Sequence, residues 1–187
     1  MNRFENWFCA SSVWRYITRE HLLPWIVAGS ELGDHVLEVG AGFGAATEEL
    51  RRRSARVASL EYDHHSAARL AAKWQDRGSA VLQGDAAALP FASKTFSAAV
   101  AILVLHHLRT RDMQDCAFAE IFRVLRPSGV FLAFEIQDRW LQRIGHIGST
   151  FTPVAPAGAN ARLTAAGFSG VRVDFRGAAF RMRALRG

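Results

Sequence analysis

From residue 36 onward, short apolar runs alternate along the chain with segments of helical composition. The apolar runs cover residues 36–39, 56–61, 80–82, 98–103 and 129–135, and the helical segments between them include residues 45–53 and 66–77. Strands that alternate with helices are typical of a parallel sheet that has helices on both faces. The pattern therefore predicts an α/β fold with a Rossmann-like, doubly wound sheet.

The segment before the fifth apolar run has a clear helical period. Phe118, Ile121, Phe122 and Leu125 occupy the i, i+3, i+4 and i+7 positions that form one face of a helix. Pro127 cannot continue a helix, and Gly129 favours a turn. We therefore predict that this helix ends within residues 126–129 and that the fifth strand follows directly.

The C-terminal part of the chain predicts an antiparallel ending. A short helix is expected over residues 163–167, because Gly167 is a typical helix terminator. Two alternating runs then flank the Arg176-Gly177 pair, at residues 171–175 and 179–183. Such close spacing around a glycine is typical of a β-hairpin. With this hairpin the sheet has seven strands, mostly parallel, with an antiparallel last strand.

Large apolar side chains recur at helical spacing in the first 30 residues, with a break near Pro24. They are Phe4, Trp7, Phe8 and Trp14 before the break and Leu22, Leu23, Trp25 and Ile26 around it. We predict two helices here, ahead of a core formed by residues 31–187. The residues of this extension can cover a binding site as a lid or simply pack into the core, and the sequence leaves both interpretations open.

The composition is that of one ordinary globular domain. Half of the 187 residues are hydrophobic and 21% are charged, which is enough apolar material for a single core. The formal net charge of +6 can attract nucleic acid, anionic lipid or an acidic partner. The arginines are nevertheless scattered along the chain, as on an ordinary solvated surface.

The cysteines indicate neither a metal site nor a disulfide framework. Cys9 and Cys116 are far apart, and neither has a second cysteine or a histidine at metal-ligand spacing. No apolar run approaches the ~20 residues that span a bilayer, and Arg3 and Glu5 interrupt any signal-peptide pattern. We therefore expect a soluble, cytoplasmic protein without a membrane span and without a bound metal.

A glycine-rich turn follows the first predicted strand. It comprises Gly40, Ala41, Gly42, Phe43 and Gly44. In open α/β sheets, ligands bind at the carboxyl ends of the strands, and the turn after the first strand is the usual contact. Glycines there permit positive φ angles and let a ligand approach the main chain. A tight strand-to-helix turn without any ligand has the same pattern, so this motif alone is weak.

Acidic residues at the ends of the next two strands strengthen the binding hypothesis. Glu61 ends the second strand, where a carboxylate can accept hydrogen bonds from both hydroxyls of a ribose. Asp85 follows the third strand, where it can accept from the exocyclic amine of adenine while the amide of Ala86 donates to the ring. Each acid alone can equally be a surface residue, but together they outline a nucleoside site.

Five motifs follow one another along the chain: VLEVGAGFG at residues 36–44, LEYD at 60–63, QGDAAALPF at 83–91, LHHL at 105–108 and IFRVLRPSGVF at 121–131. With these motifs in this order, the chain resembles the class I S-adenosylmethionine-dependent methyltransferases, in particular the ubiquinone and menaquinone biosynthesis branch. The resemblance covers about residues 32–175 and implies that S-adenosylmethionine is the cofactor. Together with the composition, it leads us to expect that the whole chain, residues 1–187, is one methyltransferase domain.

The same resemblance implies the roles of the cofactor-binding residues. Glu38 is expected to contact the amino group of the methionine moiety, Glu61 the ribose, and Asp85 and Ala86 the edge of adenine. Tyr62 is expected to pack on the adenine ring. The other expected contacts are Gly40, Ala41, Gly42 and Gly44 in the turn and Ile102 at the end of the fourth strand.

A dinucleotide-binding oxidoreductase is the main rival for the glycine turn. An acid at Glu38, inside the first strand, would repel a pyrophosphate but suits a cationic methionine end. A catalytically inactive domain that keeps the fold as a binding module is a further alternative.

The sequence says little about the methyl acceptor. His107, or its neighbour His106, can orient or deprotonate an acceptor after the fourth strand, although a loop histidine that bonds a backbone carbonyl explains it equally well. The chain has LHHL where methylases of base amino groups carry a Pro-Pro motif, and Cys116 is interpreted as a core residue rather than a nucleophile.

We therefore favour a small-molecule acceptor over RNA or protein. Residues 137–160 are expected to form a loop with substrate contacts. The candidate contacts in this loop are Trp140, His146 and Phe151.

Overall fold

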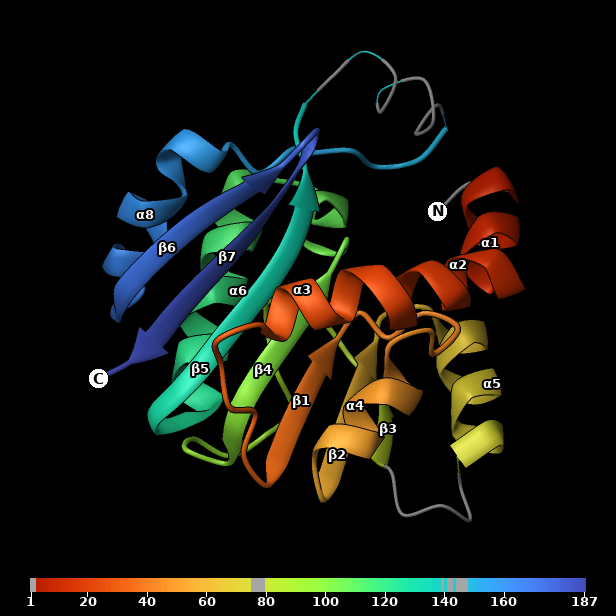
Figure 1. Cartoon of the computed structure of the whole chain (residues 1–187), viewed down its shortest axis with the longest axis horizontal. Helices are drawn as coiled ribbons and strands as arrows, with labels where there is room; N and C mark the ends of the chain where they lie inside the picture. The colour runs from red at the N-terminus through yellow and green to blue at the C-terminus, as the bar shows by residue number, and fades with distance from the viewer. Residues whose placement is uncertain (1–2, 75–79, 139, 141–142, 144–147) are drawn as a thin grey trace.

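The computed structural model describes residues 3–74, 80–138, 140, 143 and 148–187 and contains one seven-stranded sheet (Figure 1). Its strands are β1 (His35–Val39), β2 (Arg56–Glu61), β3 (Ala80–Gln83), β4 (Phe96–Ile102), β5 (Leu125–Ile136), β6 (Phe168–Arg176) and β7 (Ala179–Arg186). The order across the sheet is β3-β2-β1-β4-β5-β7-β6. The first five strands pair in parallel, and β7 runs antiparallel between β5 and β6. The predicted fold class is thereby confirmed.

The strand order reverses at β1, which pairs with β2 on one side and β4 on the other. Glu38 lies opposite Ser59 of β2 and Val100 of β4, one residue before β1 ends. Because these strands are parallel, their carboxyl ends meet at one edge of the sheet. This edge is the place where open α/β sheets bind ligands.

Helices cover both faces of the sheet. They are α1 (Arg3–Ala10), α2 (Ser12–Ile17), the π-helix η1 (Thr18–Leu22), α3 (Leu23–Val27), α4 (Thr47–Arg53), α5 (His64–Trp74), the 3-10 turn η3 (Leu105–His107), α6 (Arg111–Val124) and α8 (Pro156–Ala165). In Figure 1, α6 and α8 lie behind the sheet, whereas α2 and α3 cross its front near the arrowhead of β1. Side chains alternate between the two faces, so Leu37 packs with the α6 layer and Val36 with the α3 layer.

The N-terminal helices differ from the prediction at Pro24. The expected break there was wrong, because the chain stays helical from Ser12 to Val27. The π-helical turn before Pro24 lets the amide of Leu23 donate to the carbonyl of Thr18, and Pro24 stands in the first turn of α3, where a missing N–H is tolerated. The real interruption is at Ser11, whose hydroxyl accepts from the amide of Trp14 and caps α2.

Two other boundaries also differ from the prediction. Strand β5 begins at Leu125 rather than Gly129, because its pairing with β4 shifts register after Leu125 and accommodates Pro127 at the irregularity. Helix α8 begins at Pro156, inside the segment 137–160 that was expected to be a loop. A proline at the first helical position is a recognised start signal that the prediction overlooked.

Cys116 is exposed, so its interpretation as a core residue was wrong. It lies on α6 one residue before Ala117, which is fully buried, and thus on the neighbouring, solvent-facing side of that helix. Within the described part of the chain, no helix combines the length and the apolar character needed to cross a bilayer.

Candidate functional site

The glycine turn after β1 requires glycine for two separate reasons. Gly40 has φ +72°, and a Cβ there would lie 2.3 Å from Cγ2 of Val104. Gly42 has φ +52° with open space around it, so only its backbone conformation disfavours other residues. The amides of Gly40 and Ala41 both donate to the carbonyl of Leu60, at 2.8 and 3.1 Å, which holds the turn against the end of β2.

Glu61, at the end of β2, is bonded to this turn. Its Oε2 accepts from the amide of Gly42 at 2.7 Å, and its Oε1 accepts from the amide of Asp63 at 2.9 Å. Each carboxylate oxygen has two lone pairs, so both oxygens can still accept a hydroxyl proton. Glu61 therefore links the glycine turn to the site predicted for a ribose and keeps the acceptor capacity that a diol requires.

Glu38 is a buried carboxyl group beneath the same turn. The hydroxyls of Thr47 and Ser59 donate to its Oε2 at 2.6 and 2.7 Å. Burial raises the pKa of Glu38 to about 7, the two hydroxyl hydrogen bonds counteract this shift, and the charge of Glu61 adds to it. Among the described residues its Oε1 has no hydrogen-bond partner, and Glu38 borders a cavity. A cationic group there would be bound by the ionised form of the acid.

That cavity has a volume of about 40 Å³ and brings together residues from distant parts of the chain. The predicted site residues Glu38, Gly40, Ala41 and Ile102 line it, together with Val39, Ala45, Ala46, Trp14 and Thr18. Trp14 and Thr18 come from the N-terminal helices and were missed as site residues. Trp14 was singled out for its aromatic ring, but nothing local in the sequence indicates that Thr18 lines the same cavity as Glu38.

The three residues predicted for the adenine ring, Asp85, Ala86 and Tyr62, have different surroundings. Asp85 accepts from the amide of Ala87 at 2.8 Å through Oδ1, in a tight turn after β3 that also contains the buried Ala86. Tyr62 follows Glu61 directly and is 68% exposed. Tyr62, at the nucleoside end of the predicted site, is thus exposed to solvent, whereas Glu38, at the other end, is buried.

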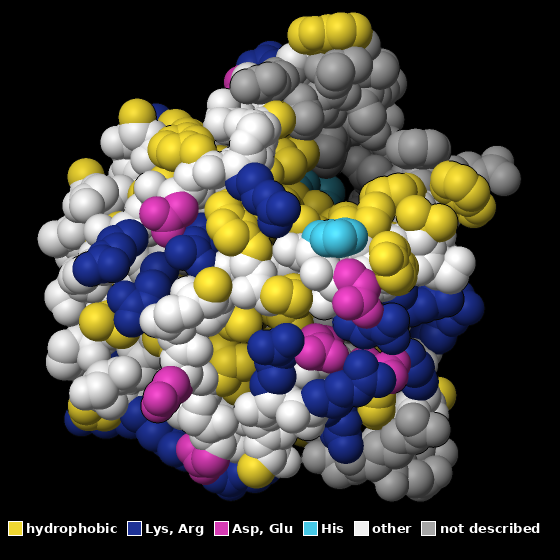
Figure 2. Space-filling model, in the orientation of Figure 1, with side chains coloured by type: hydrophobic (Ala, Val, Ile, Leu, Met, Phe, Trp, Pro, Cys, Tyr) yellow, Lys and Arg dark blue, Asp and Glu magenta, His cyan; other side chains and the backbone are white. Residues whose placement is uncertain are grey.

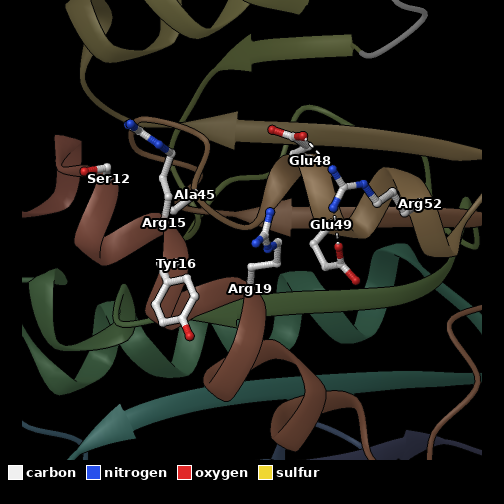
Figure 3. Close-up of a pocket in the computed structure, with 8 residues that line it drawn as sticks. All are labelled: Ser12, Arg15, Tyr16, Arg19, Ala45, Glu48, Glu49 and Arg52. Carbon is white, nitrogen blue, oxygen red and sulfur yellow. Dashed lines mark hydrogen bonds and ion pairs between the residues drawn. The ribbon is translucent and has the colours of Figure 1, made fainter.

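A larger cavity of about 260 Å³ lies between the N-terminal helices and α4 and contains none of the predicted site residues. Figure 3 shows Arg19 of the N-terminal helices extending toward Arg52 of α4, whereas the guanidinium of Arg15 is turned away from α4. Arg52 donates to Glu48 and Glu49, at 2.8 and 3.1 Å. The lining therefore carries both signs of charge, and Figure 2 shows the same interspersion of basic and acidic side chains across the visible face. This mixture is typical of an ordinary solvated surface rather than a phosphate-binding patch.

The two histidines after β4 are held in different ways. The Nδ1 of His106 donates to Oε2 of Glu135 at 2.6 Å, and both side chains are buried. The Nδ1 of His107 donates to the carbonyl of Thr150 at 3.2 Å, and His107 is partly exposed. Because each Nδ1 donates, Nε2 is the basic nitrogen of both rings in the neutral state.

Of the candidate contacts in residues 137–160, Phe151 lies 5.4 Å from the ring of His106 and so reaches the histidine segment. Trp140 is 68% exposed. His146 lies outside the described residues. The described residues contain no group of three or more His, Cys, Asp or Glu that is placed to hold a metal ion.

The chain matches the family model described as "Methyltransferase domain" over residues 37–133. This region runs from β1 to β5 and includes the glycine turn, Glu61, Asp85 and the histidine segment.

Two curated proteins and one solved structure illustrate the similarity. The chain is 35% identical to a demethylmenaquinone methyltransferase of Thermobifida fusca over 101 residues, which are 52% of this chain and 41% of that protein. It is 42% identical to a tRNA (carboxymethyluridine(34)-5-O)-methyltransferase of Arabidopsis thaliana over 57 residues, or 30% of this chain and 14% of that protein. The matched regions thus cover less than half of either relative.

A methyltransferase of Haloferax volcanii, described as putative and solved in complex with the Trm112 methyltransferase activator, superposes with a TM-score of 0.79. The superposition covers 100% of this chain and 98% of that one, at 17% identity. At this level of identity the likeness concerns the fold.

Proposed function

The chain belongs to the class I S-adenosylmethionine-dependent methyltransferases, and on this premise we propose that it transfers a methyl group from S-adenosylmethionine to a small-molecule acceptor. Family membership confirms the cofactor that the sequence resemblance implied. The observation that carries the proposal is the placement of three acids, Glu38, Glu61 and Asp85, at the carboxyl ends of β1, β2 and β3 around one glycine turn.

The residues at this edge fit the chemistry of the cofactor. Glu61 keeps the acceptor capacity for two ribose hydroxyls, and Oδ2 of Asp85 has no hydrogen-bond partner among the described residues and suits an exocyclic amine. Glu38 lines the cavity of about 40 Å³, its Oε1 has no hydrogen-bond partner among the described residues, and its carboxylate suits an ammonium group. Tyr62 provides an exposed ring beside Glu61 for stacking.

The protein's contribution to the reaction is positioning. S-adenosylmethionine, when bound, supplies a methyl group that its sulfonium centre already makes electrophilic. The residues around the glycine turn would hold the nucleoside and the amino-acid tail and so fix the orientation of the cofactor relative to the acceptor. Orientation of this kind supplies much of the rate enhancement of a displacement reaction.

His107 is the residue that we assign to the acceptor. It is the more accessible of the two histidines, and its bond to Thr150 leaves Nε2 as the basic nitrogen. His106, buried and bonded to Glu135, acts by holding the segment in place. Replacement of His107 by Asn is expected to lower kcat/KM by about 100-fold and to remove the rise of activity with pH that a histidine base produces, because base catalysis contributes about 10²–10⁴.

The small-molecule assignment is supported by the LHHL segment. Leu105 and His106 are buried there and Gln114 of α6 donates to the carbonyl of Leu105, so this segment is packed against α6 and lacks the polar-Pro-Pro arrangement that holds a flipped base. The demethylmenaquinone relative acts on a small molecule, whereas the tRNA relative leaves RNA as the main competing acceptor. The single domain over residues 1–187 and the cytoplasmic location stay predictions.

Calorimetric titration with S-adenosylmethionine tests the cofactor site. The wild type is expected to bind, and Gly42→Asp and Glu61→Ala are expected to abolish or strongly weaken binding because they alter the turn and remove the ribose acceptor. Absence of binding to the wild type would refute the enzyme assignment. Binding without turnover would instead indicate a non-catalytic binding module.

Transfer of labelled methyl groups from the cofactor into fractionated cell extract identifies the acceptor class. We expect label in the small-molecule fraction and, as a control, none with Glu61→Ala. Label confined to RNA or to protein would reject the small-molecule acceptor while leaving methyl transfer intact.

A further inference from the structure

Thr18 presents a hydroxyl group that the fold buries without a partner. The residue is 1% exposed, and its Oγ1 has no hydrogen-bond partner among the described residues. A buried hydroxyl without a partner costs about 1–3 kcal/mol. Native structures rarely keep such a group unless a ligand or a water satisfies it.

The location of Thr18 indicates a ligand. Thr18 lines the cavity of about 40 Å³ that also contains Glu38, Gly40 and Ile102. The cavity lining therefore carries a second polar side chain besides Glu38, and Trp14, one turn earlier in the N-terminal helices, contributes an aromatic ring to it. The carboxyl group of Glu38 and the hydroxyl of Thr18 thus belong to one cavity, and the other side chains that line it are apolar or belong to glycine.

The helix changes type at Thr18, the residue that lines the cavity. The α-helical hydrogen bonds of α2 give way to π-helical ones over residues 18–22. A π-helical turn places one extra residue in the turn and is frequent at functional sites. Here the change of helix type begins at the residue that faces the cavity.

We propose that the Thr18 hydroxyl donates to the carboxylate of the cofactor's amino-acid tail, opposite the contact of Glu38 with the ammonium group. The N-terminal helices then form one wall of the cofactor site and belong to it functionally. This inference deepens the proposed function, because it concerns the same cofactor cleft.

Two ligands that differ only in the tail test the proposal. S-adenosylhomocysteine carries the amino-acid tail, and 5′-methylthioadenosine lacks it. Thr18→Val keeps the shape and removes the hydroxyl. It is expected to weaken S-adenosylhomocysteine binding about 10- to 100-fold, the range for a hydrogen bond to a charged group, and to leave methylthioadenosine binding within twofold of the wild type.

The stability of the unliganded variant separates a ligand contact from a structural role. Because Thr18→Val removes an unsatisfied buried hydroxyl, we expect its Tm to rise by about 2–4 °C. Thr18→Ser is expected to restore most of the affinity. Thr164→Val, at an exposed threonine of α8, is the matched control and should change neither binding nor Tm.

Amide exchange gives a readout that does not depend on affinity. Residues 12–22 of the wild type should exchange more slowly with S-adenosylhomocysteine than with methylthioadenosine, at saturating concentrations of both. Equal affinity of Thr18→Val and the wild type for S-adenosylhomocysteine overturns the proposal, as does an equal loss of both ligands. Failure of the wild type to bind either ligand would instead refute the proposed function.

Discussion

The two ends of the predicted cofactor cleft are built in opposite ways. At the nucleoside end, Glu61 and Asp85 lie on the sheet edge with their carboxylates bonded to nearby backbone amides, and Tyr62 is largely exposed. At the tail end, Glu38 and Thr18 are buried, and they come from segments 20 residues apart in the sequence, β1 and the N-terminal helices.

This difference affects the stability of the free protein. At the nucleoside end the acids are hydrogen-bonded to nearby backbone amides and Tyr62 is exposed, so we expect these residues to lower the free energy of unfolding little. The tail end places an acid in a poorly solvated site, which raises the pKa of Glu38 and lowers the stability of the free protein at neutral pH. We expect substitutions at the two ends to differ in which ligands they affect and in their effect on stability.

Glu61→Ala is expected to have the largest effect on binding. It removes the acceptor for both ribose hydroxyls, and each hydrogen bond to a charged group contributes about 1.5–3 kcal/mol. Affinity should therefore fall by at least about 100-fold for S-adenosylhomocysteine and methylthioadenosine alike, measured by calorimetry. A loss restricted to the ligand with the tail would contradict the assignment of the two ends.

Glu38→Gln should weaken the binding of S-adenosylhomocysteine by about 10- to 100-fold and leave the binding of methylthioadenosine, which lacks the tail, unchanged. Its effect on stability depends on pH, because the pKa of Glu38 is about 7 in the folded state and 4.5 without the shift. Below pH 4.5 both states hold the proton. Between pH 4.5 and 7 the unfolded state loses its proton first, so the free energy of unfolding of the wild type falls, and above pH 7 this penalty is constant.

The Gln variant lacks this pH-dependent loss of stability. Relative to the wild type, its free energy of unfolding should increase by on the order of 3 kcal/mol between pH 4 and pH 8. Urea unfolding at pH 4, 6 and 8 measures the difference. A difference that stays constant across this range would show that Glu38 does not titrate in the free protein as described.

Gly40→Ala and Gly42→Ala separate close packing from backbone conformation within the turn. Gly40→Ala brings a Cβ to 2.3 Å from Val104 and also strains a positive φ, so we expect a loss of about 1–3 kcal/mol in the free energy of unfolding. Gly42→Ala meets open space, and strain alone should cost about 1 kcal/mol. Thermal and urea unfolding would contradict this interpretation if the two variants lost the same stability.

Tyr62→Ala is expected to have the smallest effect. The side chain is 68% exposed, so its removal leaves the fold unchanged, and stacking of a base on an exposed ring lies near the lower end of about 1–3 kcal/mol. Affinity for both ligands should fall about fivefold. Phe175→Ala, which removes another exposed aromatic side chain on the distant strand β6, serves as the control and should leave both affinities unchanged.

Much of the fold was predictable because its signals are local. The alternation of apolar runs and helical segments placed β1, β2 and β4 within two residues of their observed positions, and the Arg176-Gly177 pair predicted the hairpin. The errors arose where packing decides between local alternatives. Pro24 stands inside a helix because a π-helical turn precedes it, and Cys116 faces solvent although its helix is largely buried on the other side.

The sequence by itself determined that Glu61 and Asp85, the acids predicted to bind the nucleoside, lie at one edge of the sheet, because a carboxylate at the end of a parallel strand lies at the same edge as its neighbours. Only the tertiary structure decided what surrounds Glu38. The position of Thr18 in the same cavity as Glu38 depends on how the N-terminal helices pack across the sheet, and this packing comes from contacts between distant segments, such as those in the buried cluster that contains Ile26 of α3 and Val36 of β1. The spacing of residues along the chain does not predict that Thr18 and Glu38 line one cavity, because their proximity depends on the packing of the whole fold.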